Sequence, residues 1–316
     1  MYVGNLVIAS IFKYSKKNGI IMYENIKKIK LTDRIIIELI GTNTKSFLQP
    51  LITNNIDLVS YKKSIYAALL SPQGKYIFDF FIFENPINNQ LNIDCAKNRY
   101  KELLDKLNIY KLRNKISFNI NNDITIFSVY GSDYSKLELD LNTINLVGNT
   151  QKVNNNIIVV DPRNKNLGLR IYSNLSSSIK GFSKIPDGEQ SDLDYNRIKL
   201  VVPNPALDLE IEKSFLIENN FELINAIDFN KGCYIGQENT ARQKYRGNAK
   251  KKLFPVKIIG QNISNGTKIS YNERVIGTMR SSCKDLGLAT IRTDFYNEYK
   301  KNKLKIKVLN SQIKIL

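Results

Sequence analysis

The sequence predicts an α+β protein that ends in a small β-barrel. Strand-like runs rich in isoleucine alternate with helix-like segments between residues 34 and 245, and elements mixed in this way are typical of an α+β domain. After residue 252 the pattern changes to short strands separated by glycine or asparagine turns, as expected of a small barrel. The chain has 316 residues, which is enough for about two or three domains with well-buried cores.

The first predicted elements are a strand, a short helix and a hairpin. Residues 34–40 are rich in isoleucine and predict a strand that a glycine ends. Asn43 or Thr44 can cap the short helix that follows. Two strands at 66–70 and 76–83 are separated by Ser-Pro-Gln-Gly, which fits a type I turn with proline second and glycine fourth. This pair predicts a β-hairpin.

The rest of the chain continues the same pattern. A strand at 91–95 precedes a helix at 99–107 whose apolar residues return to one side, so we expect Cys95 to lie in the core. In the barrel, Cys283 is expected in a loop and receives no role. Further strands are predicted at 124–130, 157–161, 253–259, 275–279, 286–290 and 304–308.

The composition restricts the possible chemistry. With 47 lysines and arginines against 29 acids, the net charge is +18, which implies an acidic partner, although charge alone does not say which. Histidine is absent. Catalytic triads that contain histidine are therefore excluded, and a general base must be a carboxylate, lysine, tyrosine or thiolate.

The cysteines indicate the compartment and argue against a metal site. The three cysteines are far apart and form no Cys-x-x-Cys pair, so we expect no metal held by this chain alone. An odd number of cysteines without a secretion signal indicates a reducing compartment, and we expect a cytoplasmic protein. No apolar run approaches the length of a membrane span, so no membrane contact is expected.

Residues 1–21 fit the rest of the chain poorly. They are apolar but short, and they resemble neither a signal peptide nor an anchor. Met22 is a plausible start of translation. We therefore expect residues 1–21 to be a poorly ordered extension.

The densest chemistry lies at residues 230–247, which read NKGCYIGQENTARQKYRG. No glycine or proline interrupts 237–245, which predicts a helix that can end at the glycine of position 247. Cys233 then lies just before the helix N-terminus, where the dipole lowers the pKa of a thiol, and Lys231 adds a positive charge. We predict that Cys233 is catalytic and that Lys231 assists it. The alternative is that Cys233 is one more small buried residue.

This stretch also resembles a known family. KGCYIGQE followed by an arginine and then Arg-Gly resembles the signature of the YgfZ-type folate-binding proteins, which are relatives of the glycine-cleavage aminomethyltransferase and serve iron-sulfur protein maturation. Weaker similarity covers most of the chain, including GTMRSSCKDLGLATIR near its end. The resemblance implies a body of two intertwined lobes and a barrel arranged as a three-part ring. Its parts would be an extension (1–21), a folate-binding body (22–249) and a barrel (250–316).

The resemblance implies a bound tetrahydrofolate or a related reduced folate. Asp79 lies where aminomethyltransferases carry two consecutive acids, of which the first position is Phe78 here. Glu218 lies in place of a glutamate that grips the amino face of the pterin, a task that suits a carboxylate. Where the family has a Gly-x-Pro turn, residues 199–203 read KLVVP. The folate contacts that we predict are Glu218, Asp79, Tyr234, Gln237, Glu238 and Arg242.

The resemblance further implies a role in iron-sulfur proteins. The protein would use tetrahydrofolate while helping to assemble or repair clusters in client enzymes, including enzymes that modify tRNA. Whether it turns over a substrate stays open. One alternative is a folate-dependent aminomethyltransferase, against which Phe78 and the cysteine motif stand. Another is a direct tRNA-binding protein, which only the charge favours, since no aromatic and basic RNA module is present.

Overall fold

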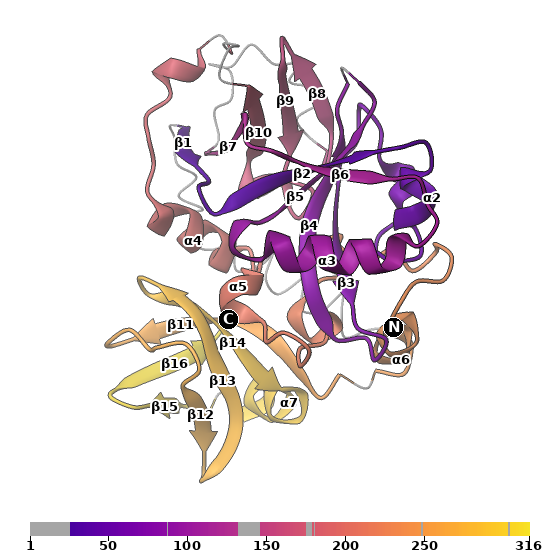
Figure 1. The fold of residues 1–316 in the computed structure, drawn as a ribbon. Helices are drawn as coiled ribbons and strands as arrows, with labels where there is room; N and C mark the ends of the chain where they lie inside the picture. Colours follow the sequence, from indigo (N-terminus) through magenta and orange to yellow (C-terminus); the bar gives the residue numbers. More distant parts are fainter. Residues whose placement is uncertain are drawn as a thin grey trace.

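Two five-stranded sheets form the body of the protein, and a six-stranded barrel follows them (Figure 1). The computed structural model describes residues 26–86, 88–131, 146–174, 179, 181–247, 249–302 and 304–316. The expected extension at 1–21 and the candidate start at Met22 lie outside these residues. Among the helices of the described ranges, none combines the length and the apolar character needed to cross a membrane.

The first sheet is antiparallel, with the order β3-β4-β5-β2-β6. The predicted strand at 34–40 and the hairpin are confirmed, and the Gly74 N–H closes the hairpin turn by donating to Ser71 O at 2.8 Å. Cys95 lies in the core of this lobe, as expected. The elements are β2 (Arg34–Ile40), α2 (Thr44–Leu48), η1 (Ile56–Leu58), β3 (Ile65–Leu70), β4 (Tyr76–Glu84), β5 (Leu91–Ala96), η2 (Lys97–Arg99), α3 (Tyr100–Lys111) and β6 (Ser117–Asn121).

The second sheet has the order β1-β7-β10-β9-β8. Although β1 precedes the first sheet in the chain, it pairs with β7 of the second sheet, so the two lobes are intertwined as expected. The elements are β1 (Lys27–Lys30), β7 (Ile124–Tyr130), β8 (Thr150–Val153), β9 (Asn156–Val160), η3 (Lys165–Leu167) and β10 (Leu169–Asn174).

A buried carboxylate joins the two sheets. Asp94 on β5 accepts a hydrogen bond from Arg34 at 2.7 Å and others from Arg170 and Tyr172 of β10. Burial alone would raise the pKa of Asp94, but Arg170 and Arg34 hold it below its usual value. Beside this network the rings of Phe83 and Tyr172 stack at 4.0 Å. Paired charges and apolar contacts therefore fix one lobe against the other.

Val201, in the segment between the sheets and the barrel, has a strained backbone. Val201 adopts φ 58°, in the left-handed region that β-branched residues rarely occupy. It stands where the resemblance expects the glycine of a Gly-x-Pro turn, a residue type that adopts a positive φ without strain. The elements of this segment are η4 (Phe182–Lys184), α4 (Gln190–Lys199), α5 (Pro205–Asp208), η5 (Ile217–Asn219) and α6 (Gln237–Tyr245).

The barrel is nearly closed, because its edge strands β12 and β15 lie next to each other. The prediction that Cys283 lies in a loop is wrong. Cys283 is the last residue of β13, since a turn of only two residues separates it from its partner Leu286. The helix α7, whose Phe295 is buried in the barrel core, was not predicted. The elements are β11 (Lys251–Ile259), β12 (Lys268–Tyr271), β13 (Arg274–Cys283), β14 (Leu286–Arg292), α7 (Thr293–Asn302), β15 (Ile306–Val308) and β16 (Ser311–Ile315).

A second buried carboxylate docks the barrel on the body. Asp208, at the end of α5, accepts from the Ser281 N–H at 2.7 Å and from Arg197 at 3.0 Å. Nearby, Arg280 of β13 pairs with Glu210 at 2.9 Å. In Figure 1 the barrel lies below α4 and α5, at the lower end of the body. These contacts place the start of the barrel beside η5, which carries Glu218.

Candidate functional site

The predicted helix at 237–245 is confirmed as α6, and a close backbone contact fixes its start. Gly236 caps the helix with φ 80°. A Cβ at this position would lie 2.5 Å from Ser71 O and 2.8 Å from Gly74 Cα, both in the hairpin turn. Only glycine fits such an approach. In addition, Asn239 donates to Gln73 O at 2.9 Å, so the motif is anchored to the turn that precedes β4.

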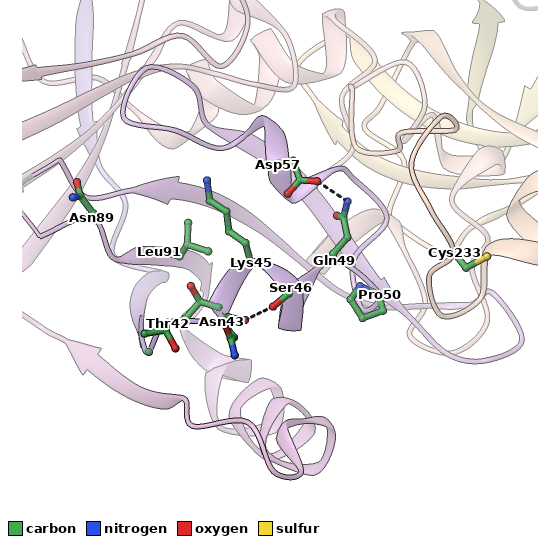
Figure 2. Close-up of a pocket in the computed structure, with 12 residues that line it drawn as sticks. Thr42, Asn43, Lys45, Ser46, Gln49, Pro50, Asp57, Asn89, Leu91 and Cys233 are labelled. Atoms are coloured by element: carbon green, nitrogen blue, oxygen red, sulfur yellow. Dashed lines mark hydrogen bonds between the residues drawn. The ribbon is translucent and has the colours of Figure 1, made fainter.

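Cys233 is exposed, three residues before the Gly236 cap. The alternative that it is a buried packing residue is therefore wrong. Around the adjacent Gly232 there is open space, since a Cβ there would meet nothing within 4 Å. Cys233 lines a pocket of about 670 Å³ beside α2. In Figure 2 it lies at the margin of this pocket, and its sulfur is directed away from the other labelled side chains. A partner molecule can therefore approach the thiol.

Lys231 is buried, and its ammonium faces carbonyl groups. Its Nζ donates to the carbonyl oxygens of Gln49, Ile52 and Asn54 at 2.6, 2.7 and 2.8 Å. Burial lowers the pKa of Lys231 to about 8, and the acids at 228 and 57 oppose this effect. At neutral pH the group therefore still carries the protons that the three carbonyls accept. The predicted catalytic lysine thus holds the loop of Cys233 against the segment that follows α2.

Asp79 lies at the centre of a hydrogen-bonded group on the hairpin. Its carboxylate accepts from the hydroxyl of Tyr66 at 2.8 Å and from that of Tyr76 at 2.6 Å. Burial, together with the negative charge of Asp79, raises the pKa of both tyrosines well above their ordinary value, so both remain donors. The side chain that the resemblance singled out is thus held by two phenols, and no lysine pairs with it in the described chain.

Glu218 is buried at the junction of body and barrel. Its carboxylate lies 3.7 Å from the Nζ of Lys251, which is longer than a hydrogen bond. Burial raises the pKa of Glu218, while Lys251 and Lys75 oppose the shift. Phe221, three residues further on, packs against both tyrosines that bind Asp79. Glu218 and Asp79 therefore border the same apolar cluster.

The other four predicted folate contacts interact mainly with the motif itself. Tyr234 is buried, and its ring faces the Lys231 Nζ at 5.3 Å. Gln237 accepts from the Tyr234 N–H at 3.3 Å. Glu238 and Arg242 pair with each other on the exposed side of α6. Tyr234 nevertheless belongs to the apolar cluster that Asp79 and Glu218 border, whereas Glu238 and Arg242 lie away from it on the exposed side of α6.

Sequence reasoning missed the residues that surround Asp79. Tyr66 could have been found, because Tyr66 pairs with Phe81 and therefore lies diagonally across from Asp79 on one face of the hairpin. No local signal indicates Arg163, whose guanidinium lies over the rings of Phe81 and Tyr66 at 4.9 and 5.6 Å. It pairs with Asp161 at 2.8 Å. Within the described ranges no three histidine, cysteine, aspartate or glutamate side chains come together to hold a metal.

The chain is similar to known proteins in its barrel and over most of its length. Residues 250–314 match a family model described as the CAF17 C-terminal beta-barrel domain. Two relatives are named iron-sulfur cluster assembly factor IBA57, mitochondrial: the mouse protein is 26% identical over 305 residues, covering 90% of this chain and 81% of that protein, and the human protein is 25% identical over 281 residues, covering 83% and 76%. A Neurospora crassa homologue of the same name is 30% identical over 234 residues, or 72% of this chain. The chain spans about half of that fungal protein, of which 52% is covered.

A solved structure shows the fold. The glycine cleavage system aminomethyltransferase T from Bartonella henselae superposes with a TM-score of 0.73, covering 92% of this chain and 85% of that one, at 11% identity. The predicted fold, an aminomethyltransferase-like α+β body followed by a barrel, is thereby confirmed.

The expectation of a cytoplasmic protein is contradicted by the relatives, which are named mitochondrial proteins. Free cysteines indicate a reducing compartment, but they do not distinguish one reducing compartment from another. The relatives are iron-sulfur cluster assembly factors, in keeping with that part of the resemblance. The YgfZ-type assignment itself stays a prediction.

Proposed function

We propose that this protein is a mitochondrial iron-sulfur cluster assembly factor whose body binds tetrahydrofolate and whose Cys233 acts in the maturation step. The main support is the similarity over 90% of the chain to a mouse protein named as such a factor. The exposed thiol lies in the stretch that the sequence alone marks as the richest in chemistry.

The residues present fit a folate. Glu218 is a buried carboxylate whose Lys251 partner lies beyond hydrogen-bond distance. Such a group is costly to bury unless a ligand supplies donors, and the amino face of a pterin carries N–H groups that a carboxylate can accept in parallel. Asp79 with its two tyrosines offers further polar contacts beside the same apolar cluster.

For the maturation step, the cluster is the cargo of the protein. A thiolate is the common ligand of iron in such clusters, and Cys233 is the exposed thiol among the three cysteines. Because the described residues contain no ready-made group of three ligands, the partner would supply the remaining ligands while Cys233 holds one iron. Serine in place of Cys233 would keep the shape but ionise far less readily.

A second candidate function is folate-dependent aminomethyl transfer, which the fold shared with an aminomethyltransferase favours. At the first of the two acid positions this chain has Phe78, which is buried under the guanidinium of Arg99 at 4.3 Å. Methylene transfer also makes no use of an exposed thiol. An assay for methylenetetrahydrofolate formation from an amine donor distinguishes the two functions.

The decisive test compares Cys233→Ser with Cys283→Ser in cells that lack the wild-type protein. Both variants should fold and bind tetrahydrofolate in calorimetry, but only Cys283→Ser should restore the activity of client iron-sulfur enzymes. Glu218→Gln should weaken tetrahydrofolate binding by about 1.5 to 3 kcal/mol, since one partner of charged hydrogen bonds is lost. Full restoration by Cys233→Ser would remove the thiol from the mechanism, and unchanged affinity in Glu218→Gln would remove the carboxylate from the folate site.

A further inference from the structure

We propose that Lys231 is a positioning residue that couples Cys233 to the group around Asp79, so that a ligand bound in the body tightens the loop that carries the thiol. This inference rests on the proposed function for the identity of the ligand. It starts from the position of Cys233 between two attachments to the same segment, 49–54.

The first attachment is the Lys231 ammonium with its three carbonyl acceptors on that segment. Three N–H groups in a tetrahedral arrangement match three converging carbonyls, whereas a planar guanidinium would not. The second attachment is the Ile235 N–H, which donates to Pro50 O at 3.0 Å. The exposed Cys233 lies between these two points and can move only as far as both allow.

The same segment is joined to strand β3 on its other side. Asn54, whose carbonyl accepts from Lys231, donates through its amide to Tyr66 O at 2.9 Å. Thr53 exchanges two further bonds with Ala68, one through its backbone N–H and one through its hydroxyl oxygen, both at 2.9 Å. The hydroxyl of Tyr66 then donates to Asp79.

These contacts form a continuous path from Asp79 through Tyr66 and Asn54 to Lys231, two residues from the thiol. Most of its members are buried, so water cannot replace the bonds without cost. A ligand that contacts Asp79 must change or reinforce the bond to Tyr66. Its effect can therefore reach the Cys233 loop along this path, although Asp79 also binds Tyr76 and Asn54 also donates to Asn225 O at 2.8 Å.

Hydrogen exchange of the amides at 232–236 in the full-length protein tests the positioning role. Lys231→Met keeps an unbranched side chain, one heavy atom shorter, and removes its bonds to the carbonyls. We expect exchange at 232–236 to become about fivefold faster or more, at the lower end of typical coupling effects, with no change in β5. The matched control is Lys28→Met, because Lys28 also donates to two carbonyls, Phe182 O and Ile185 O, but in the other lobe. It should leave residues 232–236 unchanged, and unchanged exchange in Lys231→Met would overturn the positioning role.

Tetrahydrofolate tests the coupling. At saturation it should slow exchange at 232–236 and the alkylation of Cys233 in the wild type, but not in Lys231→Met, although that variant still binds the ligand. A merely structural lysine would not remove the response to the ligand. If the response persists in Lys231→Met, the coupling is refuted. If calorimetry detects no binding to the wild type, the folate part of the proposed function fails and the coupling fails with it, whereas binding without any response refutes the coupling alone.

Should Lys231→Met fail to fold, Tyr66→Phe serves as the second variant. It removes only the hydroxyl that donates to Asp79 and keeps the ring and the backbone carbonyl that Asn54 uses. Exchange at 232–236 without ligand should then equal that of the wild type, and the response to saturating tetrahydrofolate should be lost. A full response in Tyr66→Phe would contradict the proposed path.

Discussion

Two glycines of the motif allow a sharp test of how the loop of Cys233 is built. In Gly236→Ala the new Cβ would stand 2.5 Å from Ser71 O and 2.8 Å from Gly74 Cα, and both neighbours are backbone atoms that cannot rotate away. The left-handed φ of 80° costs an alanine about 1–2 kcal/mol, and relieving the overlap costs about 1–3 kcal/mol more. We therefore expect a loss of about 2–5 kcal/mol in the free energy of unfolding.

Gly232→Ala is the matched control, four residues earlier in the same motif. Its Cβ would meet nothing within 4 Å, and its φ lies outside the left-handed region. The change should be neutral or should stabilise the protein by about 0.4–1 kcal/mol, because alanine restricts the unfolded chain. Urea unfolding of both variants measures the difference. If Gly236→Ala proves as stable as Gly232→Ala, the tight contact between the hairpin turn and α6 does not exist in solution.

Two other predictions concern stability. Burial raises the pKa of the Glu218 carboxyl in the folded protein above its value in the unfolded chain. At a pH between these two pKa values, the folded protein binds more protons than the unfolded chain. The free energy of unfolding therefore falls as pH rises through the folded pKa. Glu218→Gln should therefore gain stability relative to the wild type between pH 4 and pH 7 in thermal unfolding, whereas a constant difference would show that the carboxylate is not desolvated. Val201 and Val202 are both buried, but only Val201 has a positive φ. Val201→Gly should consequently lower the free energy of unfolding by about 1–2 kcal/mol less than Val202→Gly, because glycine relieves the strain at position 201. Denaturant unfolding measures both losses, and equal losses would argue against strain at Val201.

Local patterns predicted several elements with correct bounds. The strand at 34–40 and the helix at 237–245 were found because an apolar run or an uninterrupted helical segment ends at a glycine in each case. The hairpin was found because its turn chemistry is local. By contrast, α7 was not predicted, although its Phe295 and Tyr299 lie four residues apart and both pack in the barrel core, because the apolar side chains of this segment are all aromatic and stand among charged and polar residues.

The chain by itself therefore determined the fold class, the motif and the identity of its thiol, since these depend on residue types and spacings within a few positions. The tertiary structure decided what the motif residues do. Lys231 was expected to assist Cys233, yet its acceptors lie 177 to 182 residues away in the sequence. The exposure of Cys233 likewise depends on how separate segments pack. A side chain takes the hydrogen bonds that the folded neighbours offer, and the sequence does not state which distant carbonyls those will be.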